Sequence, residues 1–179
     1  MSHPDIMAHV TFPTPLGVAA IVWHEAGLTG FHLPEDDPAR LDAELARRAR
    51  STAAANVPPW VSAIVSRVQA HLGGVPQDFS DAPLDWTRVG AFQREVFHHT
   101  LAIRPGRTCG YGDIARAMGL PPGGARAVGA ALGSNPWPLL VPCHRVVAAT
   151  GKMTGFSGPG GVRTKTRLLA LEGAELPLD

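Results

Sequence analysis

Hydrophobic residues in the first third of the chain come in short runs that alternate with glycine and proline. The runs are AHVTF (8–12), GVAAIVW (17–23) and LTGFHL (28–33), and the sequences PTPLG and EAG stand between them. Short β-rich runs separated by turn residues predict an antiparallel meander.

Two helices are predicted after these strands. Residues 36–50 place acidic residues and a proline ahead of Leu41 and Leu45, which is typical of a helix start with a modest apolar stripe. In residues 58–74 apolar side chains recur at helical spacing, and two glycines end the run. Residues 75–86 are rich in proline and acids without an apolar period, so we interpret them as an exposed linker.

The second half of the chain predicts mainly helices. Residues 90–103 align Phe92, Val96 and Thr100 on one helix face. Residues 111–120 and 123–135 form two shorter helical patterns whose joint, GLPP, is typical of a helix-turn-helix. We therefore predict an α+β protein with two domains: residues 1–85, with a small antiparallel sheet and helices, and residues 86–179, mostly helical.

Composition places the chain among globular proteins. Of 179 residues, 45% are hydrophobic and 17% charged, which is enough apolar material for a packed core. No apolar run approaches the roughly 20 residues of a membrane span, and the first residues lack the pattern of a signal peptide. We expect no membrane contact and a cytoplasmic location, where the two distant cysteines stay reduced.

The net charge of +1 conceals an uneven distribution. Residues 1–85 carry five arginines and ten acidic residues, a charge of −5, whereas residues 86–179 carry eleven basic and five acidic residues, a charge of +6. A basic half suits a polyanion such as nucleic acid. A dimer between unlike faces is the alternative.

One face of the predicted helix at 123–135 has almost no side chains. Gly123, Ala127, Ala130 and Ser134 are spaced four, three and four apart, and Arg126 stands beside them. Such a stripe lets another helix or a nucleic acid come close to the helix backbone. Tight packing inside the domain is the commoner use and the one we favour from spacing, while the basic half favours insertion into a nucleic-acid groove.

Cys143, in the segment PWPLLVPCHRVV (136–147), is the strongest candidate for chemistry. Pro142 cannot donate in a strand ladder, so it marks an edge or turn, and we expect Cys143 at a strand's end. An isolated cysteine is usually a small hydrophobe, but His144 and Arg145 are groups that can lower a thiol pKa. His144 could reach Cys143 only through a turn or a water molecule, because neighbours on a strand point opposite ways.

Other readings of the polar residues stay open. Neither a Cys-x-x-Cys nor a His-x-x-x-His pattern accompanies Cys143, so a structural zinc has little support. His98 and His99 are neighbours on one helix and face different ways. Glu172, at the end of TRLLALEG (166–173), is either a surface residue or a buried partner for a histidine.

Together these segments resemble the O6-alkylguanine-DNA alkyltransferases, the methylated-DNA:protein-cysteine methyltransferase family. The likeness rests on PCHRVV, on ARAVGAALGSNPWPLLV before it and on GKMTGFSGPGG and LLALEG after it, and it is strong over residues 86–173. It implies a winged-helix-like domain whose helix-turn-helix enters the minor groove of double-stranded DNA and flips out an alkylated guanine. It further implies a single, irreversible transfer of a methyl or larger alkyl group from guanine O6, and also thymine O4, to Cys143, without cofactor or metal.

The resemblance assigns the catalytic residues. Cys143 matches the acceptor nucleophile, His144 its water-bridged base, and Glu172 the carboxylate that orients and charges the histidine. Asn135 matches the residue that braces the turn beside the cysteine. Tyr111 matches the tyrosine that contacts the flipped nucleotide and can protonate the leaving guanine.

The resemblance also indicates how DNA is held. Arg126 matches the side chain that fills the stack after the base leaves, with Ala127 and Ala130 against the DNA. We expect a monomer in free form and leave cooperative binding on DNA open.

The substrate pocket is where this sequence departs from the family. Val146, Phe156 and Ser157 match pocket residues, but Phe156 stands where tyrosine is common, and the segment 157–165 is about two residues longer than in many relatives. Gly110 stands where serine or threonine is common, which removes a possible helix cap or phosphate contact.

Two rival functions make different predictions. A non-catalytic binder of alkylated DNA would bind equally well after Cys143→Ala and form no adduct, although the inactive branch of the family carries tryptophan at this position. A cysteine hydrolase using Cys143 and His144 would turn over many times.

Overall fold

The computed structural model describes residues 7–35, 37–48, 50–148 and 161–175. Three strands, β1 (Met7–Thr14), β2 (Gly17–His24) and β3 (Gly27–His32), form the predicted antiparallel meander. A short strand that the sequence did not predict, β4 (Ser51–Ala53), pairs parallel to β1 and gives the sheet order β3-β2-β1-β4. The α+β class is thereby confirmed.

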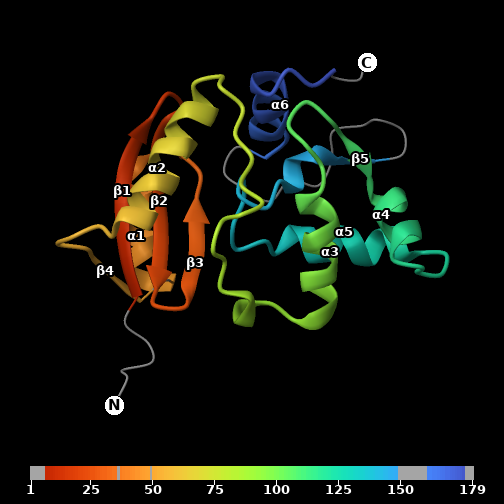
Figure 1. The fold of residues 1–179 in the computed structure, drawn as a ribbon, viewed down its shortest axis with the longest axis horizontal. Helices are drawn as coiled ribbons and strands as arrows, with labels where there is room; N and C mark the ends of the chain where they lie inside the picture. Colours follow the sequence, from red (N-terminus) through yellow and green to blue (C-terminus); the bar gives the residue numbers. More distant parts are fainter. Residues whose placement is uncertain (1–6, 36, 49, 149–160, 176–179) are drawn as a thin grey trace.

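The sheet is buried on both faces by helices α1 (Pro38–Arg48) and α2 (Pro59–Leu72). Strand β2 shows why, because its side chains alternate between two apolar clusters. Ile21 lies in the large core that includes α2, whereas Ala20 and Val22 pack with Leu41 and Leu45 of α1. Figure 1 shows the sheet with these two helices on one side of the molecule and the remaining helices on the other.

The segment 75–86 is exposed at half of its positions, as its composition suggests, but it is anchored to the core. Phe79, Leu84 and Asp85 are buried, and the backbone of Leu28 donates to Pro83 O (2.8 Å) and accepts from Asp85 N (2.9 Å). The segment thus pairs with the start of β3. The sequence could not predict this pairing, because the pattern of side chains in the segment carries no information about its backbone hydrogen bonds.

The second half contains helices α3 (Ala91–Leu101), α4 (Tyr111–Ala117), α5 (Gly124–Gly133) and α6 (Val162–Leu171), and short 3₁₀ turns at Trp86–Arg88 and Cys143–Arg145. Two short strands, β5 (Cys109–Gly110) and β6 (Val146–Val147), pair in parallel. On α3, Val96 and Thr100 are buried as predicted, but Phe92 at the exposed first turn is 40% accessible.

The two halves share one continuous apolar core. Trp137 Nε1 donates to Leu28 O (2.9 Å), and Phe31 N donates to Pro136 O (3.0 Å). The loop before Cys143 is therefore held against β3. The division at residue 85 stays a prediction. No helix among the described residues is long and apolar enough to cross a membrane.

Candidate active site

Cys143 begins a single 3₁₀ turn (Cys143–Arg145) rather than ending a strand, and strand β6 follows that turn. Pro142 (φ −80°, ψ 63°) bends the chain into it. The turn is closed by Arg145 N donating to Pro142 O at 2.9 Å. The expected strand end is therefore wrong, and the turn puts Cys143 and His144 on a bent backbone instead of on opposite faces of a strand.

Asn135 holds the chain that leads into this turn. Its Nδ2 donates to Val141 O (2.9 Å) and its Oδ1 accepts from Trp137 N (2.9 Å). The side chain also hydrogen-bonds Cys143, an interaction that favours the thiolate. One amide thus links the loop after α5 to the half-buried thiol.

His144 and Glu172 form a buried pair. His144 Nε2 lies 2.7 Å from Glu172 Oε1, and both residues are buried, which settles the question the sequence left open for Glu172. His144 Nδ1 is buried and has no protein hydrogen-bond partner among the described residues. A buried nitrogen of this kind is suited to a bridging water.

Arg145 turns toward Glu172 and not toward the thiol. Its Nε donates to Oε2 (3.0 Å) and its Nη2 to Oε1 (2.8 Å), a two-pronged contact. Nη1 donates to Ile103 O (2.7 Å). Arg145 therefore neutralises the buried carboxylate and does not activate Cys143 directly.

The protonation states follow from burial and these contacts. Burial alone would raise the pKa of Glu172, but hydrogen bonds from His144, His71 and Arg145 hold it far below its ordinary value. Burial lowers the pKa of His144, although Glu172 opposes this. Burial also raises the pKa of Cys143, despite Asn135 and the charge of Lys165. The resting site thus holds a thiol, a neutral imidazole and an ionised carboxylate, in contrast to the lowered thiol pKa that its neighbours suggested.

Lys165 is a buried residue of the site that the sequence analysis missed. Its Nζ donates to Val146 O (2.7 Å) and lies 3.5 Å from Tyr111 Oη. Burial lowers its pKa, while Cys143 opposes that shift. A signal was available, because Lys165 shares the helical face of Leu168, Leu169 and Glu172.

Tyr111 begins α4 and is half-buried. Burial, and the negative charge that Cys143 carries once it is a thiolate, raise the pKa of Tyr111, so its hydroxyl keeps a proton to donate. The nitrogen of Lys165 lies 5.7 Å from the ring centroid. The predicted pocket residue Val146 is buried next to them, whereas Phe156 and Ser157 lie outside the described residues.

The small-residue stripe of α5 faces solvent. Gly123, Ala127, Ala130, Ser134 and Arg126 are all exposed. The inward face is the other one, with Val128, Ala131 and Leu132 buried as predicted. The packing interpretation of the stripe is therefore wrong, and an exposed, nearly flat helix face with one arginine remains.

Gly110 is the N-cap residue of α4 and, as predicted, supplies no side-chain cap, but its own N–H is bound by the first turn. Asp113 Oδ2 accepts from Gly110 N (2.9 Å). A Cβ on residue 110 would approach that oxygen to 2.9 Å. A side chain at position 110 would therefore displace the exposed, flexible carboxylate of Asp113.

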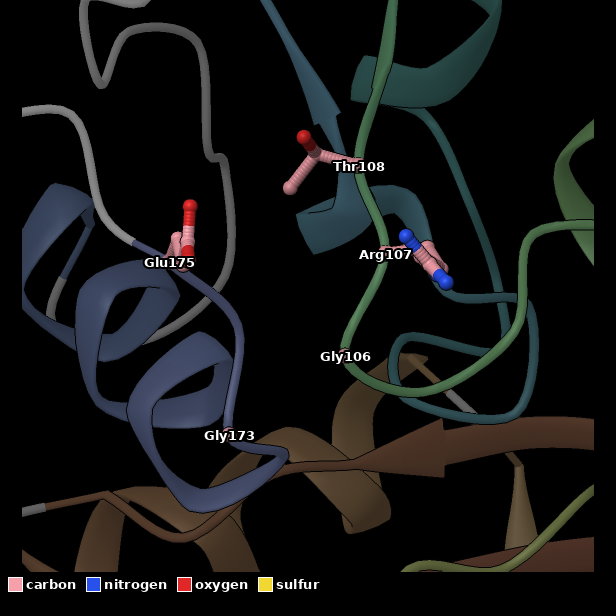
Figure 2. Close-up of a pocket in the computed structure, with 5 residues that line it drawn as sticks. All are labelled: Gly106, Arg107, Thr108, Gly173 and Glu175. Carbon is pink, nitrogen blue, oxygen red and sulfur yellow. The ribbon is translucent and has the colours of Figure 1, made fainter.

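A pocket lies beside Glu172 and apart from the thiol. Figure 2 shows its lining residues, Gly106, Arg107 and Thr108 on the loop before β5, and Gly173 and Glu175 after α6. None of the predicted catalytic residues lines it. Among the described residues, no three His, Cys, Asp or Glu side chains cluster as metal ligands would.

Comparison with known proteins agrees with this geometry. The family model described as 6-O-methylguanine DNA methyltransferase, DNA binding domain, matches residues 91–174. A methylated-DNA–protein-cysteine methyltransferase of Mycobacterium tuberculosis is 37% identical over 171 residues, which cover 94% of each protein. A DNA base-flipping protein of Thermus thermophilus is 44% identical over 107 residues, 60% of this chain and 69% of that protein.

A solved structure extends the likeness to three dimensions. The crystal structure of Mycobacterium tuberculosis OGT in complex with DNA superposes with a TM-score of 0.74 at 36% identity, covering 92% of each chain. Similarity of this extent includes the sheet and α2 as well as the site. The chain belongs to the family of methylated-DNA–protein-cysteine methyltransferases.

Proposed function

We propose that this protein repairs alkylated DNA directly, by moving one methyl or larger alkyl group from guanine O6, and also from thymine O4, to Cys143. The observation that carries the proposal is that His144, directly after Cys143, forms a buried pair with Glu172, and that His144 Nδ1 has no protein partner in the described part of the chain. An imidazole held in this way can take the thiol proton through water.

The reaction balances without any further reactant. The Cys143 proton passes to His144 through a water molecule, and Glu172 stabilises the imidazolium. The thiolate attacks the alkyl carbon, a carbon–sulfur bond forms, and the bond from carbon to guanine O6 breaks with its electrons left on the guanine. The purine gains a proton, which in the net balance is the one that left Cys143, so the net products are guanine and an S-alkyl cysteine. Ordinary active-site bases do not cleave a thioether, so each molecule acts once.

Tyr111 and Lys165 serve the leaving guanine. Tyr111, with its raised pKa, donates the proton or a hydrogen bond to the departing base. Lys165, held by Val146 O at 2.7 Å, places positive charge near both the phenol and the thiol. That charge favours the thiolate before transfer and the anionic base during it. A carbonyl oxygen has two lone pairs, so Val146 O can accept a hydrogen bond from the edge of the flipped base as well as from Lys165.

Helices α4 and α5 and the turn between them serve as the DNA-binding helix-turn-helix of a winged-helix-like domain. The support is the exposed stripe with Ala127 and Ala130, which allows α5 to approach the minor groove closely. Arg126, exposed beside it, fills the gap left by the flipped base. We assign this role to residues 86–179 and treat residues 1–85 as the companion domain, in a cytoplasmic protein that is monomeric when free.

Intact-mass measurement after incubation with O6-methylguanine duplex DNA tests the proposal. We expect one added methyl group, located on the peptide that contains Cys143. The second cysteine supplies a matched control: Cys109→Ser should still gain the methyl group and Cys143→Ser should not. An unmodified wild-type protein that binds the duplex would indicate the lesion-binding alternative, and repeated ester or amide cleavage would indicate a hydrolase.

A further inference from the structure

Helix α2, from the part of the chain outside the matched DNA-binding domain, sends one side chain into the active site. His71 is buried near the end of α2. Its Nε2 lies 2.9 Å from Oε1 of Glu172, which is 101 positions further along the chain. The same oxygen contacts His144 Nε2 (2.7 Å) and Arg145 Nη2 (2.8 Å). Three nitrogens therefore share Oε1.

The backbone fixes which nitrogen of His71 carries the proton. Gln77 N donates to His71 Nδ1 at 2.9 Å. An amide N–H can only donate, so Nδ1 is unprotonated in this arrangement and the proton lies on Nε2. His71 therefore donates to Glu172. The ring is also packed against Phe79, with 5.5 Å between the ring centroids.

Among the described residues, the side chains that donate to the carboxylate come from two elements. His144 and Arg145 reach Glu172 from the 3₁₀ turn, and His71 reaches it from α2. Lys165 on α6 and Tyr111 on α4 lie near the thiol of Cys143. His71 is thus the donor from the N-terminal half, and it acts on the oxygen that holds His144.

Each donor to a carboxylate oxygen spreads its negative charge and lowers its attraction for a proton nearby. With His71 present, Glu172 orients His144 but attracts a proton onto that imidazole less strongly. Without it, Glu172 would hold a protonated His144 more tightly. His144 would then lose its proton, and become able to accept the thiol proton of Cys143, only at higher pH.

We infer that His71 is a positioning residue for alkyl transfer, whose Nε2–H fixes Oε1 of Glu172 and limits how strongly that carboxylate favours protonated His144. The inference rests on the proposed relay of Cys143, His144 and Glu172. It gives the N-terminal half a part in the chemistry, acting through Glu172 and without contact with the reacting atoms.

Two substitutions at position 71 separate this role from packing. His71→Gln retains an N–H that can reach Glu172, whereas His71→Leu retains bulk without a donor. Val68→Ala, one turn earlier on α2, removes buried apolar atoms and has no group that could donate. The rate of a single turnover on O6-methylguanine duplex DNA is measured against pH for all three variants and the wild type, together with the melting temperature.

We expect His71→Leu to move the acid limb of the profile to higher pH by about half a unit or more, which slows transfer several-fold below neutral pH. His71→Gln should restore most of the wild-type profile. Val68→Ala should lower the melting temperature and leave the limb in place. A limb that is no more displaced in His71→Leu than in Val68→Ala would overturn the inference.

A second measurement is independent of DNA repair. Titration of the His144 imidazole by NMR should give a higher pKa in His71→Leu than in the wild type. An unchanged His144 titration would refute the role of His71 even where alkyl transfer is observed. Conversely, a raised His144 pKa in a protein that forms no adduct would uphold the coupling between His71 and His144 and count against the proposed function alone.

Discussion

His144 and Glu172 meet at 2.7 Å in a part of the core that solvent does not reach, although 28 positions separate them in the chain. The contact joins the 3₁₀ turn that carries Cys143 to the residue that ends α6. A carboxylate in such surroundings is stable only when its oxygens are matched by donors. The donors from His144, His71 and Arg145 therefore make the site a structural element as well as a reactive one.

Replacing Glu172 should damage stability and reaction together. Glu172→Gln keeps the shape of the side chain but leaves Arg145 buried without its counter-ion, and breaking a buried ion pair costs about 3–5 kcal/mol. We expect a loss of this order in the free energy of unfolding, measured with urea, and at least a tenfold slower transfer to Cys143. Glu175→Gln, an exposed acid three residues on, is the control and should change neither. Equal stability of the two variants would contradict the structural role.

Stability should fall as the pH is lowered from neutrality. In the folded protein the pKa of His144 lies below its ordinary 6.5 and that of Glu172 below its ordinary 4.5. The unfolded chain therefore binds more protons than the folded one, first below about pH 6.5 and then more steeply below about pH 4.5. Urea midpoints at a series of pH values should decline in these two stages, and the second should be shallower in Glu172→Gln, where only other carboxylates with lowered pKa values, such as Asp85, remain. A midpoint that stays constant from pH 8 to pH 4 would rule this out.

The local pattern of hydrophobic and turn residues was sufficient to predict most of the strands and helices. The three strands and the helices at 58–74, 90–103 and 123–135 follow from period and turn residues, because each buries a face that local sequence defines. Strand β4 was missed since three residues carry no period, and its pairing with β1 is a tertiary contact. The anchoring of residues 75–86 was missed for the same reason, because it comes from backbone hydrogen bonds to Leu28 at the start of β3.

The residues of the candidate site could be predicted only where they belong to the segments that resemble the family. His144, Glu172 and Asn135 could be named from the resemblance. His71 could not, because nothing near it in sequence hints at a carboxylate 101 positions away. The thiol pKa was misjudged for a related reason: the neighbours of Cys143 in sequence suggest activation, while burial, which sequence does not reveal, raises it.

The thiol of the resting protein should react slowly at neutral pH. Burial raises the pKa of Cys143 above its ordinary 9.0, and the charge of Lys165 works against that shift. In a Cys109→Ser background, alkylation of Cys143 by iodoacetamide should accelerate through the alkaline range. Lys165→Met, which keeps the length and removes the charge, should displace this titration further upward and slow alkylation at pH 8 several-fold. Fast alkylation already at pH 6 would mean that the thiolate is present at rest.

The exposed stripe of α5 should tolerate a large side chain in the folded protein but not on DNA. Ala130→Glu places bulk and negative charge on a surface that we assign to the minor groove, and an exposed substitution changes stability by less than about 0.5 kcal/mol. Affinity for duplex DNA should fall at least tenfold at moderate salt. Ala46→Glu, at an exposed position of α1, is the matched control. Comparable losses from both would assign the effect to net charge and not to the stripe.

Arg126 should matter for DNA and not for the chemistry of the thiol. The side chain is exposed at the first turn of α5, so Arg126→Ala should leave the melting temperature unchanged. Filling the gap in the base stack stabilises the flipped state, which is required only in a duplex. We therefore expect transfer from O6-methylguanine in duplex DNA to slow at least tenfold, while reaction with the free alkylated base changes less than about twofold. Arg40→Ala, exposed on α1, removes the same charge from the other half and serves as the control. Equal losses on duplex and free base would remove the stack-filling role and place Arg126 in the reaction itself.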